Sequence, residues 1–162
     1  DTAPALVALE AEMLVSRNGK TRSVSAEKFF LGPAVDITRM TVLEKEDILT
    51  EIRVPKKWAG AKQYFEKVAD RETWDFALVN LAMVAKVSGG KVTDVRMTCG
   101  GVQCTPRRLT SVESLMKGEK IGTEMETLAN RVAAQGAKAL NYNHFKIPLM
   151  GNLAARAVRS LA

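Results

Sequence analysis

Two stretches of the chain alternate apolar and polar side chains with the period of two that is typical of β-strands. Residues 48–54 alternate in this way and stop at Pro55, and residues 91–98 alternate directly after a Ser-Gly-Gly turn. Residues 63–69 also have the composition of a strand. Residues 76–87 are apolar almost throughout, which fits a buried helix or a buried strand, and the glycine turn after them favours the strand of a hairpin.

The first third of the chain predicts short elements. Residues 3–9 read as a helix whose preceding polar residues can cap it. Asn18 and Gly19 stand between two β-prone runs and predict a tight hairpin, because both central positions of such a turn need a positive φ. Residues 26–30 read as another short helix or turn, which the following Gly-Pro pair ends.

Beyond residue 101 the pattern is helical. Thr110 and Thr123 each precede a glutamate by three positions, which is the spacing of a capping box at a helix start. Gly118 stands where a C′ glycine ends a helix. A last helix places one apolar face toward the core, formed by Leu149, Leu153, Ala157 and Leu161. Strands followed by helices predict an α+β fold, with a meander-like antiparallel sheet and helices on one of its faces.

Length and composition describe an ordinary globular chain. Its 162 residues, 46% of them hydrophobic, fit one domain or one domain plus part of another. A shift in composition at residues 55–57 predicts the junction between two parts. No apolar run reaches the length of a membrane span, and no signal peptide is visible. The chain begins at Asp1 without an initiator Met, so we expect a fragment or a processed chain.

Charge and cysteine usage exclude little by themselves. The net charge of +6 could indicate nucleic acid, but the basic residues are interleaved with acids, so a solvated surface is the better interpretation and a nucleic-acid binder a distant alternative. Cys99 and Cys104 have the spacing that opens a plant-type ferredoxin site but lack its remaining cysteines. We therefore expect a reduced cytosolic pair of core thiols and no cluster.

The residues alone identify no catalytic group and no metal site. His144 is the single histidine, and no partners for a catalytic triad or a metal centre accompany it, so we expect a surface or partly packed residue. Lys67 and Arg71 bracket a segment where charge density rises at the end of a predicted strand. They fit either a structural ion network or a charge pair that faces a ligand or a partner subunit.

Several motifs occur in a specific order along almost the whole chain. They are Asp1-x-x-Pro4-Ala-Leu; Phe30-x-Gly32 with Leu43-x-x-x-Asp47-Ile-Leu49; Tyr64-x-x-Lys67-x-x-x-Arg71-x-x-x-Asp75-Phe; Val92-x-Asp94-x-Arg96 with Gly100-Gly101, Pro106-Arg-Arg108 and Glu113-x-Leu-x-x-Gly118; and Asn143-x-Phe-Lys146-Ile-Pro-Leu. This ordered set resembles the flavin subunits of molybdenum hydroxylases of the xanthine dehydrogenase and CO dehydrogenase type.

The resemblance implies a fold and a division of the chain. Residues 1–55 are similar to the C-terminal part of a PCMH-type FAD-binding domain. Residues 58–162 are similar to a CO dehydrogenase flavoprotein C-terminal domain, an antiparallel sheet packed with about three helices. The α+β fold expected from the residue pattern agrees with this implication.

The resemblance also implies a function. Asp1 would accept hydrogen bonds from FAD hydroxyls, Leu49 would pack near the flavin or adenine, and Lys67 would approach the isoalloxazine ring, where positive charge favours the reduced flavin. Arg71 would be structural. The implied protein is a cytoplasmic FAD-dependent oxidoreductase subunit that passes electrons from [2Fe-2S] clusters through FAD to NAD or another acceptor. Its partners would be a molybdopterin-binding large subunit and a [2Fe-2S] small subunit in a hetero-oligomer.

One departure from the family concerns the diphosphate of FAD. The glycine-rich segments that hold it in this family lie upstream of the residue that corresponds to Asp1. We therefore expect the isolated chain to bind FAD weakly or not at all and to be inactive. An alternative from another class is a subunit-docking α+β module that does not itself bind flavin.

Overall fold

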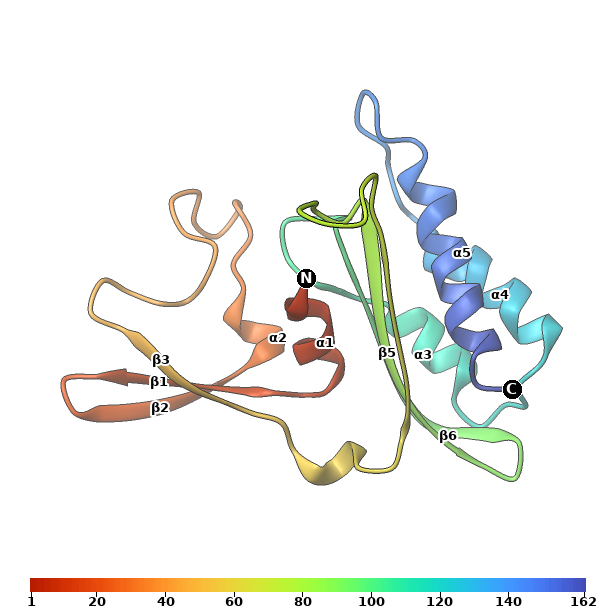
Figure 1. Ribbon diagram of the computed structural model, residues 1–162, viewed down its shortest axis with the longest axis horizontal. Helices are drawn as coiled ribbons and strands as arrows, with labels where there is room; N and C mark the ends of the chain where they lie inside the picture. The colour runs from red at the N-terminus through yellow and green to blue at the C-terminus, as the bar shows by residue number, and fades with distance from the viewer.

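A computed structural model describes all residues of the chain, 1–162. The molecule is elongated, with one antiparallel sheet at one end and a second antiparallel sheet near the middle (Figure 1). One has three strands in the order β2-β1-β3, and the other has four in the order β4-β5-β6-β7. The strands are β1 (Glu12–Arg17), β2 (Lys20–Ser25), β3 (Ile48–Arg53), β4 (Lys62–Val68), β5 (Val79–Ser88), β6 (Lys91–Gly100) and β7 (Arg107–Arg108).

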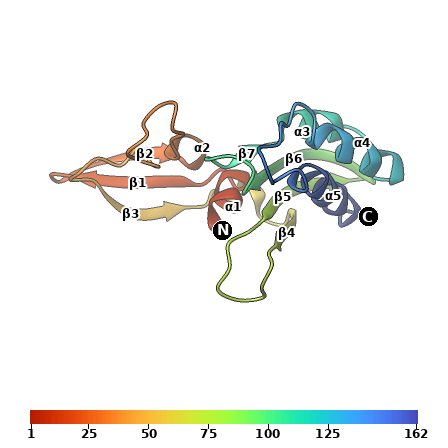
Figure 2. The same ribbon diagram turned by 90° about the horizontal axis from the view of Figure 1, so that it is seen from above.

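The helices belong to two groups. The first group precedes the larger sheet in the sequence: α1 (Thr2–Ala8), α2 (Ala26–Phe29) and the 3-10 helix η1 (Lys56–Trp58). The second group follows the larger sheet and covers one of its faces: α3 (Thr110–Met116), α4 (Thr123–Ala133) and α5 (Lys146–Arg159). From above, α1 lies between the two sheets and α3, α4 and α5 lie at the far end (Figure 2). None of the helices combines the length and the apolar character of a membrane span.

The smaller sheet confirms the predicted hairpin. Asn18 and Gly19 form the two-residue turn between β1 and β2, with φ of 48° and 76°. The third strand, β3, pairs with the other edge of β1. A small apolar cluster fills the space between this sheet, α1 and α2, and its buried members are Val7, Ala11, Met13, Val15, Ala26 and Phe29.

The larger sheet resolves the ambiguous apolar segment as a strand. Successive side chains of β5 point to opposite faces of the sheet. Both faces are buried, so odd-numbered and even-numbered residues of the strand are apolar alike. Val79, Leu81 and Met83 belong to the main core, together with side chains of α3, α4 and α5. Ala82 and Val84 point the other way and pack with Ala8 of α1 and Trp58 of η1. The sheet is therefore covered on both faces, and α1 attaches the N-terminal part of the chain to it.

Three details of the C-terminal part differ from expectation. The two-residue strand β7 interrupts the segment predicted to be helical. A strand so short carries no alternating pattern, so the sequence did not indicate it. Neither predicted capping box forms: Thr110 and Thr123 are the first residues of their helices, and no side chain caps either start. Cys104 is exposed rather than a core thiol, while Cys99 is buried. The predicted C′ position of Gly118 is confirmed by its φ of 88°, two residues after the end of α3.

Candidate functional site

Three residues form a row across the larger sheet, on the face that α1 covers. Strand pairing places Lys67 of β4 opposite Asn80 of β5, and Asn80 opposite Gly100 of β6. The first residue of the chain, Asp1, lies over this row, directly before α1. The Lys67 ammonium donates to Asp1 Oδ2 at 2.6 Å and to the backbone carbonyl of Asp75 at 2.5 Å. Residues far apart in the sequence therefore meet at one point.

Asn80 is the polar centre of this row. Its side chain is only 3% exposed within an otherwise apolar strand. Its Nδ2 donates to Asp1 Oδ1 at 3.4 Å, and its Oδ1 is buried without a hydrogen-bond partner. A buried oxygen without a hydrogen-bond partner is costly, so its position at the row of Lys67 and Gly100 calls for an explanation.

Gly100 makes room for that amide. A Cβ at this position would lie 2.3 Å from Asn80 Oδ1 and 2.8 Å from Cγ of Pro4. Only a residue without a side chain lets β6, Asn80 and α1 approach so closely. The close approach explains why a glycine occupies the last position of a ten-residue strand.

Asp1 and Asn80 line an open pocket of about 340 Å³. Pro4 and Gly100 form part of its wall, and the aromatic side chains of Phe30 and Phe76 also line it. Phe76 is 90% exposed although it is a large apolar residue. Small ligands are usually bound by such mixtures of apolar walls and a few placed polar groups. The pocket has no lysine or arginine in its lining.

The three residues that were expected to contact flavin lie in different places relative to the pocket. Asp1 lines the pocket, and Lys67 is hydrogen-bonded to Asp1 without belonging to the lining itself. Leu49 lies in β3 of the smaller sheet, where it packs against the N-terminal apolar cluster and does not line this pocket. The sequence reasoning missed Asn80 and Phe76. A single amide inside the apolar run 76–87 was the available signal for Asn80.

Arg71 stabilises the loop that follows β4. Its guanidinium donates to the carbonyl of Trp74 at 2.7 Å and lies 3.8 Å from the carboxylate of Asp75. Its backbone N–H donates to the same carboxylate at 2.8 Å. Trp74 adopts a φ of 53°, which is unusual for a bulky side chain, and it is 94% exposed. These contacts connect Arg71 to its own loop rather than to the pocket.

Comparison with known families accounts for this arrangement. Residues 63–161 match the CO dehydrogenase flavoprotein C-terminal domain, and residues 1–57 match the FAD-binding domain of molybdopterin dehydrogenases. The chain belongs to the CO dehydrogenase flavoprotein C-terminal domain family. The resemblance and the α+β fold expected from the sequence are thereby confirmed. The pocket lies where the two matched parts meet, since Asp1 and Pro4 come from one and Asn80 and Gly100 from the other.

Curated relatives of this flavoprotein family include proteins described as medium chains. The chain is 33% identical over 131 residues to the glyceraldehyde dehydrogenase medium chain of Sulfolobus acidocaldarius, covering 80% of this chain and 44% of the relative. It is 34% identical over 138 residues to the carbon monoxide dehydrogenase medium chain of Hydrogenophaga pseudoflava, covering 85% and 45%. The chain thus spans about half the length of the curated relatives it matches.

Solved structures of the family have the same fold. Carbon monoxide dehydrogenase from Hydrogenophaga pseudoflava, in a form that lacks the Mo-pyranopterin moiety of its molybdenum cofactor, superposes with a TM-score of 0.86 at 29% identity. The alignment covers 99% of this chain and 55% of the solved one. Reconstituted CO dehydrogenase from Oligotropha carboxidovorans gives a TM-score of 0.85 at 22% identity, over 99% and 55% of the two chains, which shows the shared fold alone.

Proposed function

We propose that this protein is the FAD-carrying subunit of a multi-subunit molybdenum hydroxylase. In this function electrons from [2Fe-2S] clusters pass through FAD to NAD or another acceptor. The observation that carries the proposal is the meeting of Asp1, Lys67 and Asn80 at the pocket of a chain from this flavoprotein family. We also propose that the boundary between two domains lies between residues 55 and 58, with the pocket formed by both.

The chemical groups of the pocket fit the hydroxyl-bearing part of FAD. The Asp1 side chain is 41% exposed, so its carboxylate still has acceptor positions open beside the bonds from Lys67 and Asn80. Hydroxyl groups are natural donors to such a carboxylate, and charge-assisted hydrogen bonds of this kind are strong. Asn80 contributes by donating from its Nδ2 to Asp1 Oδ1, which helps to hold the carboxylate at the pocket.

The same pocket does not fit a diphosphate. Its lining has no cationic side chain and includes the carboxylate of Asp1. A diphosphate needs backbone N–H groups or positive charge. We infer that a segment of a longer protein supplies these groups, in line with relatives that are about twice as long. The expectation that this chain alone binds FAD weakly or not at all stays a prediction.

Bound FAD would supply the redox chemistry, and the chain would supply position and charge. The Lys67 ammonium donates a hydrogen bond to the Asp1 carboxylate and a second one to the backbone carbonyl of Asp75, so the lysine fixes the position of the carboxylate. The positive charge of Lys67 next to the pocket favours electron acceptance by Coulomb attraction. The predicted role of Leu49 as a flavin or adenine contact stays a prediction.

Partner subunits are proposed from the names of the relatives and from the surface. A medium chain implies larger and smaller companions, and we propose a molybdopterin-binding large subunit and a [2Fe-2S] small subunit in the same assembly. We propose that exposed large apolar side chains in the loop after β4 and in the segment before α5 contact these partners: Trp74, Phe76, Leu140, Tyr142 and Phe145. A cytoplasmic location is part of this proposal.

The proposal is tested by Asp1→Asn in the full-length protein. The substitution keeps the shape of the side chain and removes its charge, so FAD affinity should fall by about tenfold or more, as for loss of a charge-assisted hydrogen bond. The measurement is the quenching of flavin fluorescence on titration with protein. Asp70→Asn is the matched control, because Asp70 is exposed and makes no ion pair. A full-length protein that binds no FAD would favour the docking module, and unchanged affinity in Asp1→Asn would show that the pocket is misassigned.

A further inference from the structure

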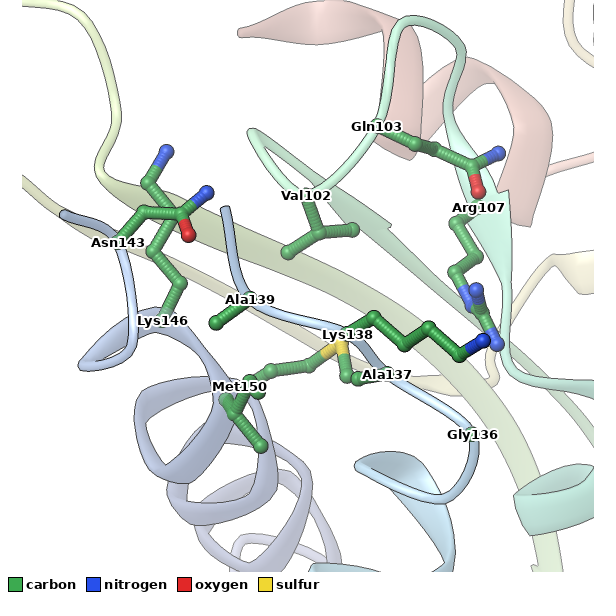
Figure 3. Close-up of a pocket in the computed structure, with 11 residues that line it drawn as sticks. Val102, Gln103, Arg107, Gly136, Ala137, Lys138, Ala139, Asn143, Lys146 and Met150 are labelled. Carbon is green, nitrogen blue, oxygen red and sulfur yellow. The ribbon is translucent and has the colours of Figure 1, made fainter. Parts of the chain in front are cut away.

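A second pocket of about 200 Å³ lies beside the first and has the opposite electrostatic character. It is formed by the connection between β6 and β7, the loop between α4 and α5, and the start of α5 (Figure 3). Gln103 lines both pockets, so they share a wall. Arg107, Lys138 and Lys146 line the second pocket, and its lining has no aspartate or glutamate.

The two side chains on one wall of this pocket are unpaired cations. The chain has eleven arginines, and all but Arg107 and Arg131 lie within 4.0 Å of a carboxylate. Lys138 also has no carboxylate partner within that distance. The Lys138 ammonium and the Arg107 guanidinium point toward each other in Figure 3. Two like charges that lie close together without an acid repel each other. An anion bound between them is attracted to both, and this attraction outweighs their mutual repulsion.

The opposite wall adds donors that are already held in place. Lys146 donates to the backbone carbonyl of Gly101 at 2.8 Å, which fixes its side chain across the pocket from Lys138. Asn143 Oδ1 accepts the backbone N–H of Leu140 at 2.6 Å, so the amide NH₂ of Asn143 is left as a donor. Val102 and the buried Met150 form apolar parts of the lining.

We propose that this pocket binds a phosphate-type oxyanion, either inorganic phosphate or the end group of a small organic phosphate. A guanidinium and an ammonium directed at one point are the groups that proteins use for phosphate. The volume corresponds to roughly seven water molecules at about 30 Å³ each, which suits one phosphate group with a few carbon atoms. It lies below the range of about 300–1,000 Å³ that is typical of drug-sized ligands, so a whole dinucleotide is not expected here. The proposal does not depend on flavin binding.

The test is a calorimetric titration of the purified full-length protein with inorganic phosphate, at an ionic strength held constant with chloride. We expect saturable binding that weakens about tenfold or more in Arg107→Gln and in Lys138→Gln. Arg131→Gln is the matched control, because it removes the other arginine without a carboxylate partner, on α4 and outside this pocket. Lys138 is exposed in a loop, so its variant should fold normally, and melting curves establish this for each variant.

Three results would overturn the proposal. The first is an absence of saturable phosphate binding at millimolar concentrations in the wild-type protein. The second is an equal loss in Arg131→Gln, which would indicate a general attraction to net positive charge. The third is binding of an acidic peptide that is weakened by Arg107→Gln and Lys138→Gln but is not displaced by phosphate, since the pocket would then be a contact for a protein carboxylate. Titration with glycerol 3-phosphate separates the two phosphate sources: tighter binding than that of inorganic phosphate identifies an organic phosphate.

Discussion

Lys67 Nζ lies 2.6 Å from Asp1 Oδ2, although 66 positions separate the two residues in the sequence. Strand β4 holds the lysine, and the start of α1 holds the carboxylate. The Lys67 side chain is 28% exposed and that of Asp1 is 41% exposed, so solvent screens the pair only in part. Its position at the pocket gives it a significance beyond the small stability of a surface ion pair.

Replacing Lys67 with Met in the full-length protein should make a bound flavin harder to reduce. Loss of one positive charge that contributes about 1.4 kcal/mol would lower the two-electron potential by roughly 30 mV. Asp1 also loses its ion-pair partner, so we expect weaker FAD binding as well. Spectroscopic titration against a reference dye measures the potential. Lys91→Met is the control, because Lys91 is exposed at the distant turn between β5 and β6. An unchanged potential would contradict the role assigned to Lys67.

Replacing Gly100 with Ala should damage the pocket and destabilise the fold. The added Cβ would meet Asn80 Oδ1 at 2.3 Å and the ring of Pro4 at 2.8 Å, so α1 or the amide must move. Overpacking of this kind costs about 1–3 kcal/mol. Denaturant unfolding measures the loss. Gly32→Ala is the control, because its nearest neighbouring atom would be 3.9 Å away. Equal stability of the two variants would show that the contact relaxes without cost.

The residue pattern predicted the elements well because their signals are local. The Asn18-Gly19 turn, the strands 48–54 and 63–69 and the C′ position of Gly118 each depend on residues within a few positions of one another. The capping box predicted at Thr110 failed for a long-range reason. Glu113 accepts the backbone N–H of Met97 at 2.9 Å and pairs with Arg108, so it is occupied by β6 and β7 instead of the helix start.

The site was only partly within reach of sequence reasoning. Asp1 and Lys67 followed from the family resemblance, and their contact could not be computed from spacing. Asn80 and Gly100 become recognisable only when strand register places them beside Lys67, because neither residue type indicates a ligand by itself. The basic pocket has the same origin: Arg107 and Lys138 are 31 positions apart and meet through packing of α4 and α5 against the sheet.

Glu27 should stabilise the protein at neutral pH and lose this effect in acid. Burial alone would raise its pKa, but the hydrogen bond from Arg96 and the charge of Arg108 outweigh burial and hold the pKa below the usual 4.5. A depressed folded-state pKa contributes stability above the usual value, and this is lost as the pH falls through the folded-state pKa. The side chain is 46% exposed, so solvent screening limits the effect.

The variant Glu27→Gln tests this pH dependence. We expect its melting temperature to lie a few degrees below that of the wild-type protein at pH 7, and the difference should shrink below about pH 4. Glu72→Gln is the control, since Glu72 is exposed and makes no ion pair. A difference that persists unchanged in acid would show that Glu27 acts through packing and hydrogen-bond geometry rather than charge.

The two cysteines should react very differently with a thiol reagent at pH 8. Burial raises the pKa of Cys99 to about 12, against the opposing charge of Arg107, and the side chain is 0% exposed. Cys104 is exposed and lines the pocket that begins at Asp1. The thiolate is the reactive form, so one thiol should react quickly in the native chain and the second only on unfolding. Ellman titration counts them, and Cys104→Ser should abolish the fast reaction.

The same thiol reports on the ligand of the pocket. If FAD occupies the space beside Asp1 and Asn80 in the full-length protein, it should shield Cys104 and slow its modification, because Cys104 lines the same pocket as Asp1 and Asn80. The measurement is the rate of modification with and without saturating FAD. Inorganic phosphate should leave this rate unchanged, since the basic pocket lies on the other side of Gln103. Protection by phosphate but not by FAD would reverse the assignment of the two pockets.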